Sequence, residues 1–288
     1  MDGVTVVSLR PADPDGGVLM SKFLAVLRAA ILPLGWVCAL LALGVPLWFA
    51  AAALGSKWEF WSLETGLMWM THTVGPILLL ACIGAGLAAA MLMLLHGVLA
   101  RRAFGVVTSP VMALAVGAAG LGWTWHVDRT RDAVPELLDV TTDPADPPHF
   151  TAAFVARRSL QDLTLDYEGK RGADGRMLAE VQAAAYPALT TLQVDRSPQA
   201  VFAQAMDYAH ANRWRVGTAS RSAGMFEAGA ESFWFGLRDD IVVRVREDGA
   251  GGSLVDIRSL ARRPVHDLGR NARRVRDFRD AMAIGGAH

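Results

Sequence analysis

The 288-residue sequence contains little cysteine, lysine or tyrosine, and long parts of its first half contain no charge at all. Its two cysteines, Cys38 and Cys82, both lie in apolar stretches, which argues against a small domain held together by disulfide bonds. The mean hydropathy is +0.29 and the apolar residues are unevenly spread. The composition therefore indicates a membrane-embedded part followed by a charged domain rather than one soluble globule.

Common catalytic and ligand-binding motifs are also absent. The sequence has no GxSxG, no SxxK and no glycine-rich phosphate loop. Its seven histidines do not recur at the spacing of metal ligands. We therefore expect no cofactor and no metal, and a binding role is favoured over catalysis.

Three runs in the first half are uncharged and exceed the ~18 to 20 residues that cross a bilayer core. They are Ile31–Gly55, Leu67–Ala100 and Ala103–His126. Within residues 28–126 they predict three transmembrane helices at about 30–54, 70–99 and 104–125. A cleaved signal peptide is the alternative for the first run, but that run is about twice as long as the apolar part of a signal peptide.

Basic residues near the predicted spans indicate the orientation. Lys22 and Arg28 precede the first span, and Arg101 with Arg102 fill the second loop, so the positive-inside rule places the N-terminal tail, residues 1–27, in the cytoplasm. Three crossings of the cytoplasmic membrane would then place residues 127–288 on its outer side. Six tryptophans fall at the predicted outer boundary, where indole rings are favoured: Trp48, Trp58, Trp61, Trp69, Trp123 and Trp125. Whether translation starts at Met1 or Met20 stays open.

The part after the third span is charged but balanced, with 22 basic and 23 acidic residues from residue 128 onward. Strand patterns and two capped helices alternate in the order strand, helix, four strands, helix. The strands are expected near 188–194, 214–219, 225–235, 241–246 and 254–260, and the helices near 198–212 and 268–283. The expected fold is therefore multi-domain: a three-helix, all-α transmembrane segment, then an α+β domain with an antiparallel sheet and helices on one face.

Alternation along the last two strands separates two kinds of side chain. Aliphatic residues of both strands share the core face, so Arg244, Arg246, Asp256 and Arg258 must share the opposite face. Asp239 and Asp240 are neighbours and point to opposite sides of the sheet, so they cannot form an acid/base pair. We interpret them as a strand start or as a cross-strand partner of Arg258.

Eight arginines lie between Arg258 and Arg279. On the last helix, which Asp267 can cap, Arg270, Arg273 and Arg274 are expected to point outward, and much of the run is then simply a solvated helix face.

A second interpretation makes part of this segment an anion site near the N-terminus of that helix, where backbone donors favour negative charge. Its residues would be Arg258, Arg262, Arg263, His266 and Arg279. The carboxylate of Asp267 argues against it, because an ordinary cap would occupy the same donors.

The expected topology makes nucleic acid an improbable partner. An envelope protein, anionic lipid or glycan suits an exported arginine-rich domain better. One alternative is an envelope enzyme for a lipid-linked or phosphorylated substrate, with Asp256 or Asp267 as base. Another is a subunit of a homo- or hetero-oligomeric membrane complex, because small residues recur every fourth position at Ala81, Ala85, Ala89 and at Ala113, Gly117.

Four successive blocks resemble a widespread bacterial and plastid domain of unknown function. They are DVTTDPADPPHF, AAAYPALTTLQV, FGLRDDIVVRV and VDIRSLARRPVHDLGRNARRVRDF, within residues 137–283; the last is similar to the typical VDVRSxSRxGxxDLGxNAxRIRxF. The resemblance implies no activity, cofactor or catalytic residue, and some members are membrane-attached. The motif residues here are Asp256, Arg258, Arg262, Asp267, Leu268, Gly269, Asn271, Ala272 and Arg276. Ala261 replaces a serine of the motif and Pro264 a glycine, which speaks against a role for that hydroxyl.

Overall fold

The computed structural model describes residues 14–100, 108–158, 163–172 and 174–284. The chain forms two compact units. One contains the chain up to Ala52 together with residues from Glu64 to Thr124. The other contains Ala53–Leu63 and the chain from Trp125 onward. The expected basic loop at Arg101 and Arg102 and residues 1–13 of the N-terminal tail lie outside the described residues.

The first unit is helical. Its elements are α1 (Pro14–Lys57), the π-helix η1 (Glu64–Val74), α2 (Gly75–Ala100) and α3 (Thr108–Ala133), of which α1 and α3 extend past the unit's boundaries. Two stretches are long and apolar enough to cross a membrane, Gly17–Lys57 and Glu64–Ala100. The expectation of three spans is therefore met for two. The described helix α3 does not pass the same test, because it is less apolar than α2 and ends in a charged stretch from Asp128 to Asp132.

Small residues allow the helices of this unit to pack closely. Ala89 and Ala113 are almost fully buried, in one cluster with Cys38. A Cβ atom on Gly117 would lie 2.8 Å from Ile83 Cδ1, and one on Gly86 would lie 2.6 Å from Leu114 Cγ. Of the expected small-residue faces, Ala89, Ala113 and Gly117 therefore serve contacts between α2 and α3 of the same chain, whereas Ala81 is exposed.

The second unit contains a six-stranded antiparallel sheet. Its strands are β1 (Asp139–Thr141), β2 (Leu192–Val194), β3 (Arg215–Ser220), β4 (Met225–Glu231), β5 (Arg238–Glu247) and β6 (Ser253–Ala261). Strand order is β1-β6-β5-β4-β3, and β2 pairs with β6 on the same edge as β1. The predicted α+β class and antiparallel sheet are confirmed, and β1 is an additional strand within the proline-rich segment.

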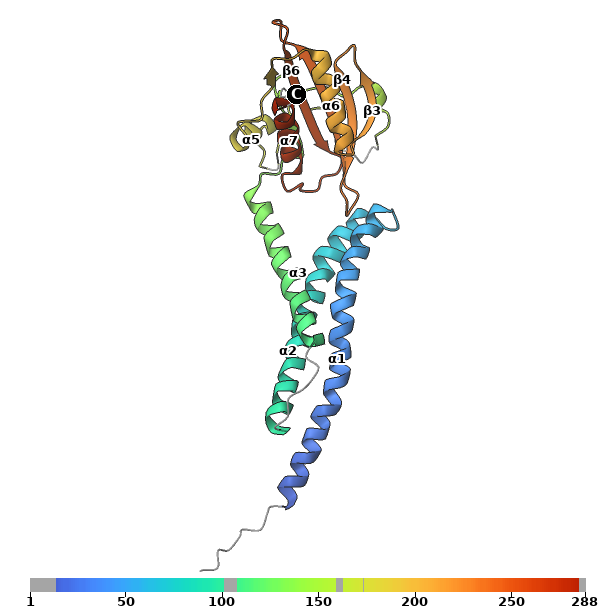
Figure 1. Ribbon diagram of the computed structural model, residues 1–288, viewed down its shortest axis with the longest axis vertical. Helices are drawn as coiled ribbons and strands as arrows, with labels where there is room; N and C mark the ends of the chain where they lie inside the picture. The colour runs from blue at the N-terminus through green and yellow to red at the C-terminus, as the bar shows by residue number, and fades with distance from the viewer. Residues whose placement is uncertain (1–13, 101–107, 159–162, 173, 285–288) are drawn as a thin grey trace, which may run out of the picture. The chain divides into compact units, whose positions relative to one another are not determined.

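Two helices, α6 (Pro198–Ala211) and α7 (Arg270–Ile284), cover one face of this sheet (Figure 1). Ser197 caps α6 by accepting a hydrogen bond from Ala200 N, and Pro198 occupies the first turn, where no N–H is needed. Phe278 of α7 and Phe226 of β4 are at most 1% exposed. This face is the apolar core of the domain.

The opposite face is covered by irregular chain. Residues 142–150, which follow β1, contact the ionisable side chains of β5 and β6, and we call them the covering segment. The short helix α4 (Ala152–Val155) follows. Thr151 binds the buried carboxylate of Glu227 through both its N–H and its hydroxyl. Another helix, α5 (Leu178–Ala185), supplies Gln182, whose amide pairs with the N–H and carbonyl of Thr141. This covering segment is the reason why the second face holds buried charges.

Candidate functional site

Arg258 is fully buried on the face of the sheet away from α6 and α7. Its Nε and Nη2 atoms lie 2.9 and 2.8 Å from the two carboxylate oxygens of Asp139, a bidentate pair. Nη2 also donates to Leu165 O, and Nη1 donates to Pro148 O at 3.4 Å. Of the two interpretations of Asp239 and Asp240, the pairing with Arg258 is wrong, because β1 brings Asp139 to this place instead. Their position at the start of a strand is confirmed. An arginine with all its partners inside the protein cannot receive an outside anion.

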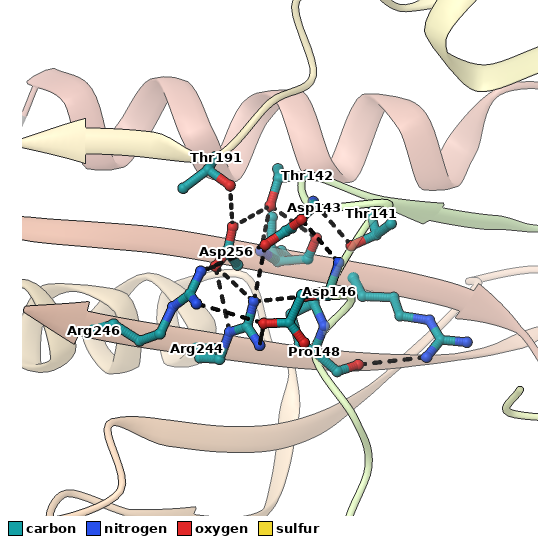
Figure 2. A network of polar contacts seen from close by, with 11 residues as sticks. Thr141, Thr142, Asp143, Asp146, Pro148, Thr191, Arg244, Arg246 and Asp256 are labelled. Atoms are coloured by element: carbon teal, nitrogen blue, oxygen red, sulfur yellow. Dashed lines mark hydrogen bonds and ion pairs between the residues drawn. The ribbon is translucent and has the colours of Figure 1, made fainter. Parts of the chain in front are cut away.

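Asp256 is the centre of a second buried network on the same face (Figure 2). One oxygen accepts hydrogen bonds from the hydroxyls of Thr191, at 2.6 Å, and Thr142, at 3.2 Å. The other accepts from Arg246 Nη2 at 2.7 Å and from Arg244 Nη2 at 3.0 Å. The expected grouping of Asp256 with these arginines on one face is correct.

The covering segment completes this network. Arg244 also contacts the carboxylates of Asp143 and Asp146, at 3.2 and 3.0 Å. Arg246 lies 3.5 Å from each of the same two carboxylates. Because both oxygens of Asp256 already accept hydrogen bonds, this carboxylate has little capacity left to act as a general base. The geometry suits a role in holding residues 142–146 onto the sheet.

Asp239 and Asp240 point to opposite faces, as their neighbouring positions require. Asp239 pairs with Arg270 at 2.8 Å and with Arg274 at 2.7 Å, both from α7. These two arginines were expected to point outward; they turn instead toward the sheet because Asp239 at the start of β5 offers a buried carboxylate. On the other face, Asp240 pairs with Arg262 at 2.8 Å.

The chain enters α7 through a tight turn built by motif residues. Asp267 accepts hydrogen bonds from Gly269 N at 2.9 Å and from Asn271 N at 2.7 Å. Leu268 and Gly269 have φ angles of 53° and 73°, in the left-handed region that glycine tolerates best. His266 Nδ1 accepts from Leu268 N at 3.0 Å. The donors that an anion would use are therefore occupied by the protein's own side chains.

The remaining predicted anion ligands do not gather at one place. Arg279 donates from Nε to Thr190 O at 2.9 Å, and the guanidinium of Arg276 lies 5.8 Å from the centroid of the Tyr186 ring. Arg263 is exposed. Of the five predicted residues, Arg262 lines a cavity at the ends of three strands.

That cavity, the arginine pocket, has a volume of about 290 Å³. It opens beside the ends of β3, β4 and β5. Its lining combines four arginines with one aspartate and with small or apolar groups: Phe154, Arg157, Arg215, Gly229, Ala230, Arg238, Asp239 and Arg262.

Positive charge prevails around the arginine pocket. Three carboxylates lie at the pocket. Glu231 contacts Arg215 and Arg238, and Asp240 pairs with Arg262. Asp239, in the lining itself, already pairs with two arginines of α7. The side chain of Arg215 is 67% exposed and that of Arg238 is 50% exposed, so both can reorient toward a ligand at small cost. The four lining guanidinium groups, together with Arg270 and Arg274 on Asp239, outnumber these three carboxylates and leave a cationic hollow.

Sequence reasoning missed three of these arginines, Arg157, Arg215 and Arg238. Arg157 follows the end of α4, and Arg215 and Arg238 are the first residues of β3 and β5. Arg215 and Arg238 come close only through the register of the sheet. Arg215 pairs with Gly229 of β4, and Arg238 pairs with Glu231, two residues further along the same strand. The one local signal was the place of Arg238 in the block FGLRDDIVVRV, just before the expected strand 241–246.

Among the described residues, no group of three or more histidine, cysteine, aspartate and glutamate side chains is placed to hold a metal ion. Burial raises the pKa of the Tyr167 phenol, whose ring packs against Arg258, and the Asp139 carboxylate raises it further. Burial likewise raises the pKa of Tyr186, beside Asp267. These phenols stay protonated at neutral pH and belong to the structural networks.

Comparison with known proteins agrees with the resemblance seen in the sequence. No curated protein matches the chain. The family model described as "Protein of unknown function (DUF1499)" matches residues 139–282, from the first residue of β1 to the last turns of α7. This match covers half of the chain and includes both buried networks and the strand residues of the arginine pocket, and the protein therefore belongs to the DUF1499 family.

Proposed function

We propose that this protein is an integral membrane protein that presents its DUF1499 domain on the outer side of the cytoplasmic membrane, where the domain binds an anionic lipid, glycan or envelope protein without catalysing a reaction. Support for membrane attachment comes from the two apolar helices. The exported orientation rests on α3 as a third span, since residues 103–126 carry no charge. With two crossings, the domain would stay in the cytoplasm.

Reporter fusions test this orientation directly. A fusion after Arg102 should be active as a cytoplasmic reporter, and a fusion after His288 should be active only as an exported one. Two cytoplasmic reporters would contradict the three-span topology and would return cytoplasmic phosphates and nucleic acid to the possible ligands.

The observation that carries the binding function is the arginine pocket. Its exposed guanidinium groups can donate charge-assisted hydrogen bonds to a phosphate or carboxylate, the strongest class of such bonds in proteins. The buried networks, in contrast, already have partners, and neither Asp256 nor Asp267 lines the pocket. The geometry therefore favours capture of an anion over acid/base chemistry.

Calorimetric titration of the full-length protein in neutral detergent with inorganic phosphate tests the pocket. Loss of one charge-assisted hydrogen bond costs about 1.5 to 3 kcal/mol, so Arg238→Glu and Arg215→Glu should each weaken binding about 10- to 100-fold.

Arg221→Glu is the matched control, because Arg221 is an exposed arginine in the turn at the other end of β3. Equal affinity in all three variants would exclude the arginine pocket as the binding site.

A further inference from the structure

The turn between β4 and β5, residues 232–237, carries two exposed aromatic side chains. Phe233 is 70% exposed and Trp234 is 53% exposed, and their rings pack edge to face with centroids 5.1 Å apart. Within the described residues between 139 and 282, one other large apolar side chain is exposed, Val155. An exposed aromatic pair on an otherwise polar surface marks an interaction site. We call residues 232–237 the aromatic tip.

Strand register shows which end of the sheet bears this tip. Asp139, the first residue of β1, pairs with Leu260, which pairs with Asp240, which pairs with Gly229. These residues form one row across four strands. β4 runs from this row toward the aromatic tip, so Phe233 lies four residues beyond it, or about 13 Å along an extended strand.

The same row is where the chain arrives from the helices. α3 ends at Ala133, and five residues connect it to Asp139, a link that spans at most about 20 Å. The membrane-attached part of the chain is thus joined to the sheet at the end that bears the aromatic tip. The turn at residues 221–224 and the loop at residues 248–252 lie at the other end.

Arginines flank the tip at this end. Arg238 directly follows it, and Arg215 pairs with Gly229 in the terminal row. Both line the arginine pocket. Aromatic rings favour the headgroup zone of a bilayer, and arginines beside them attract anionic headgroups within a Debye length.

We propose that the aromatic tip inserts into the headgroup region of the membrane that anchors this chain, and that anionic lipid is the partner of this end of the domain. Phe233 and Trp234 enter the interface, while Arg215 and Arg238 face lipid phosphates. Insertion depends on the proposed membrane attachment but applies to either leaflet, so it does not depend on the exported orientation.

Depth-dependent quenching tests this placement. The full-length protein, with Cys38→Ala and Cys82→Ala, receives a single cysteine through Phe233→Cys, which leaves Trp234 in place and is labelled with an environment-sensitive fluorophore. In nanodiscs of phosphatidylcholine and phosphatidylglycerol, lipids with a nitroxide near the headgroup should quench this label at least about threefold more than a label at Ser222→Cys, in the turn at the opposite end. Equal quenching at the two positions would overturn the proposal.

Hydrogen exchange gives a second measurement without a label. Deuterium uptake of a peptide covering residues 231–237 should be slower in these nanodiscs than in detergent, while uptake of residues 220–225 should not change. Unchanged uptake at both places would also contradict insertion.

The same samples distinguish a lipid phosphate from a free phosphate as the anion that Arg215 and Arg238 contact. Replacing phosphatidylglycerol by phosphatidylcholine should reduce quenching at position 233 if lipid phosphates with net negative charge hold the arginines. Strong quenching together with no phosphate binding in the calorimetric titration would retain the inserted tip and reject the pocket as an anion site. Phosphate binding without quenching would retain the pocket and reject the insertion.

Discussion

The two faces of the sheet are stabilised by different interactions, although the same strands build both. On the face under α6 and α7, aliphatic and aromatic side chains such as Ile257 and Phe278 are buried against one another. On the other face, Arg258, Asp256 and Glu227 are buried to the same degree but carry charge. Burial of apolar groups is favourable by itself, whereas buried charges need exact partners to offset their lost hydration. The apolar face can therefore tolerate modest repacking, and the charged face cannot lose a partner cheaply.

The charged face should show the largest effect of a single substitution. Arg258→Met removes the guanidinium and leaves the carboxylate of Asp139, 1% exposed, with only Lys170 as a cationic partner. Breaking a buried ion pair in this way costs about 3 to 5 kcal/mol. Pulse proteolysis of the full-length protein across a urea series would measure the loss.

The double variant with Arg258→Met and Asp139→Asn separates pairing from packing. It should recover part of the loss, because the uncompensated charge is gone. A single-variant loss below about 1 kcal/mol would show that this pair does not hold the covering segment on the sheet.

Truncation on the apolar face provides the comparison. Met282 is fully buried in the helix-covered core, and Met282→Ala should cost about 2 to 5 kcal/mol, depending on how far the neighbouring side chains close the cavity. Met282→Leu keeps the volume and should cost less than about 1.5 kcal/mol. Similar losses for the two variants in the same urea assay would mean that packing is not what this face contributes.

A smaller effect is expected where α7 begins. Asp267→Ala removes the acceptor of Gly269 N and Asn271 N and should cost about 0.5 to 2 kcal/mol. Asp267→Asn, which keeps one acceptor oxygen, should lose less. If the alanine variant instead kept its stability but lost phosphate binding, the carboxylate would belong to a ligand site rather than to the helix cap.

The smallest effect at neutral pH should come from Tyr167, whose buried hydroxyl has no hydrogen-bond partner among the described residues. Tyr167→Phe should leave stability at pH 7 unchanged or raise it by up to about 1 kcal/mol, because an unsatisfied buried hydroxyl is costly.

The same variant has a pH signature. The pKa of Tyr167 is raised in the folded protein, so the folded state retains a proton that the unfolded state releases above about pH 10. Stability should fall as pH rises beyond this value, and Tyr167→Phe should fall less steeply. Parallel curves for the two proteins between pH 9 and 11 would show that Tyr167 titrates normally.

Local sequence patterns predicted the main helices and strands of the domain, but not β1, α4 or α5. Ser197 followed by Pro198 correctly predicted the start of α6, and the alternation in β5 and β6 correctly separated the two faces. These predictions succeed because capping and the two-residue period of a strand depend on residues a few positions apart. The residues that line the arginine pocket escaped the same reasoning, because Arg157, Arg215 and Arg238 lie far apart in the chain.

The sequence by itself determined that apolar helices precede an α+β domain, that β5 and β6 have one aliphatic and one charged face, and that Asp267 can cap α7. Only the tertiary structure decided the partners of the charges. Arg258 pairs with Asp139, 119 positions earlier, because β1 joins the edge of β6, and two arginines of α7 turn inward because β5 presents Asp239 to them. The attraction between two charges depends on their distance in space and not on their separation along the chain. A local pattern therefore shows which face carries a charge but not which residue neutralises it.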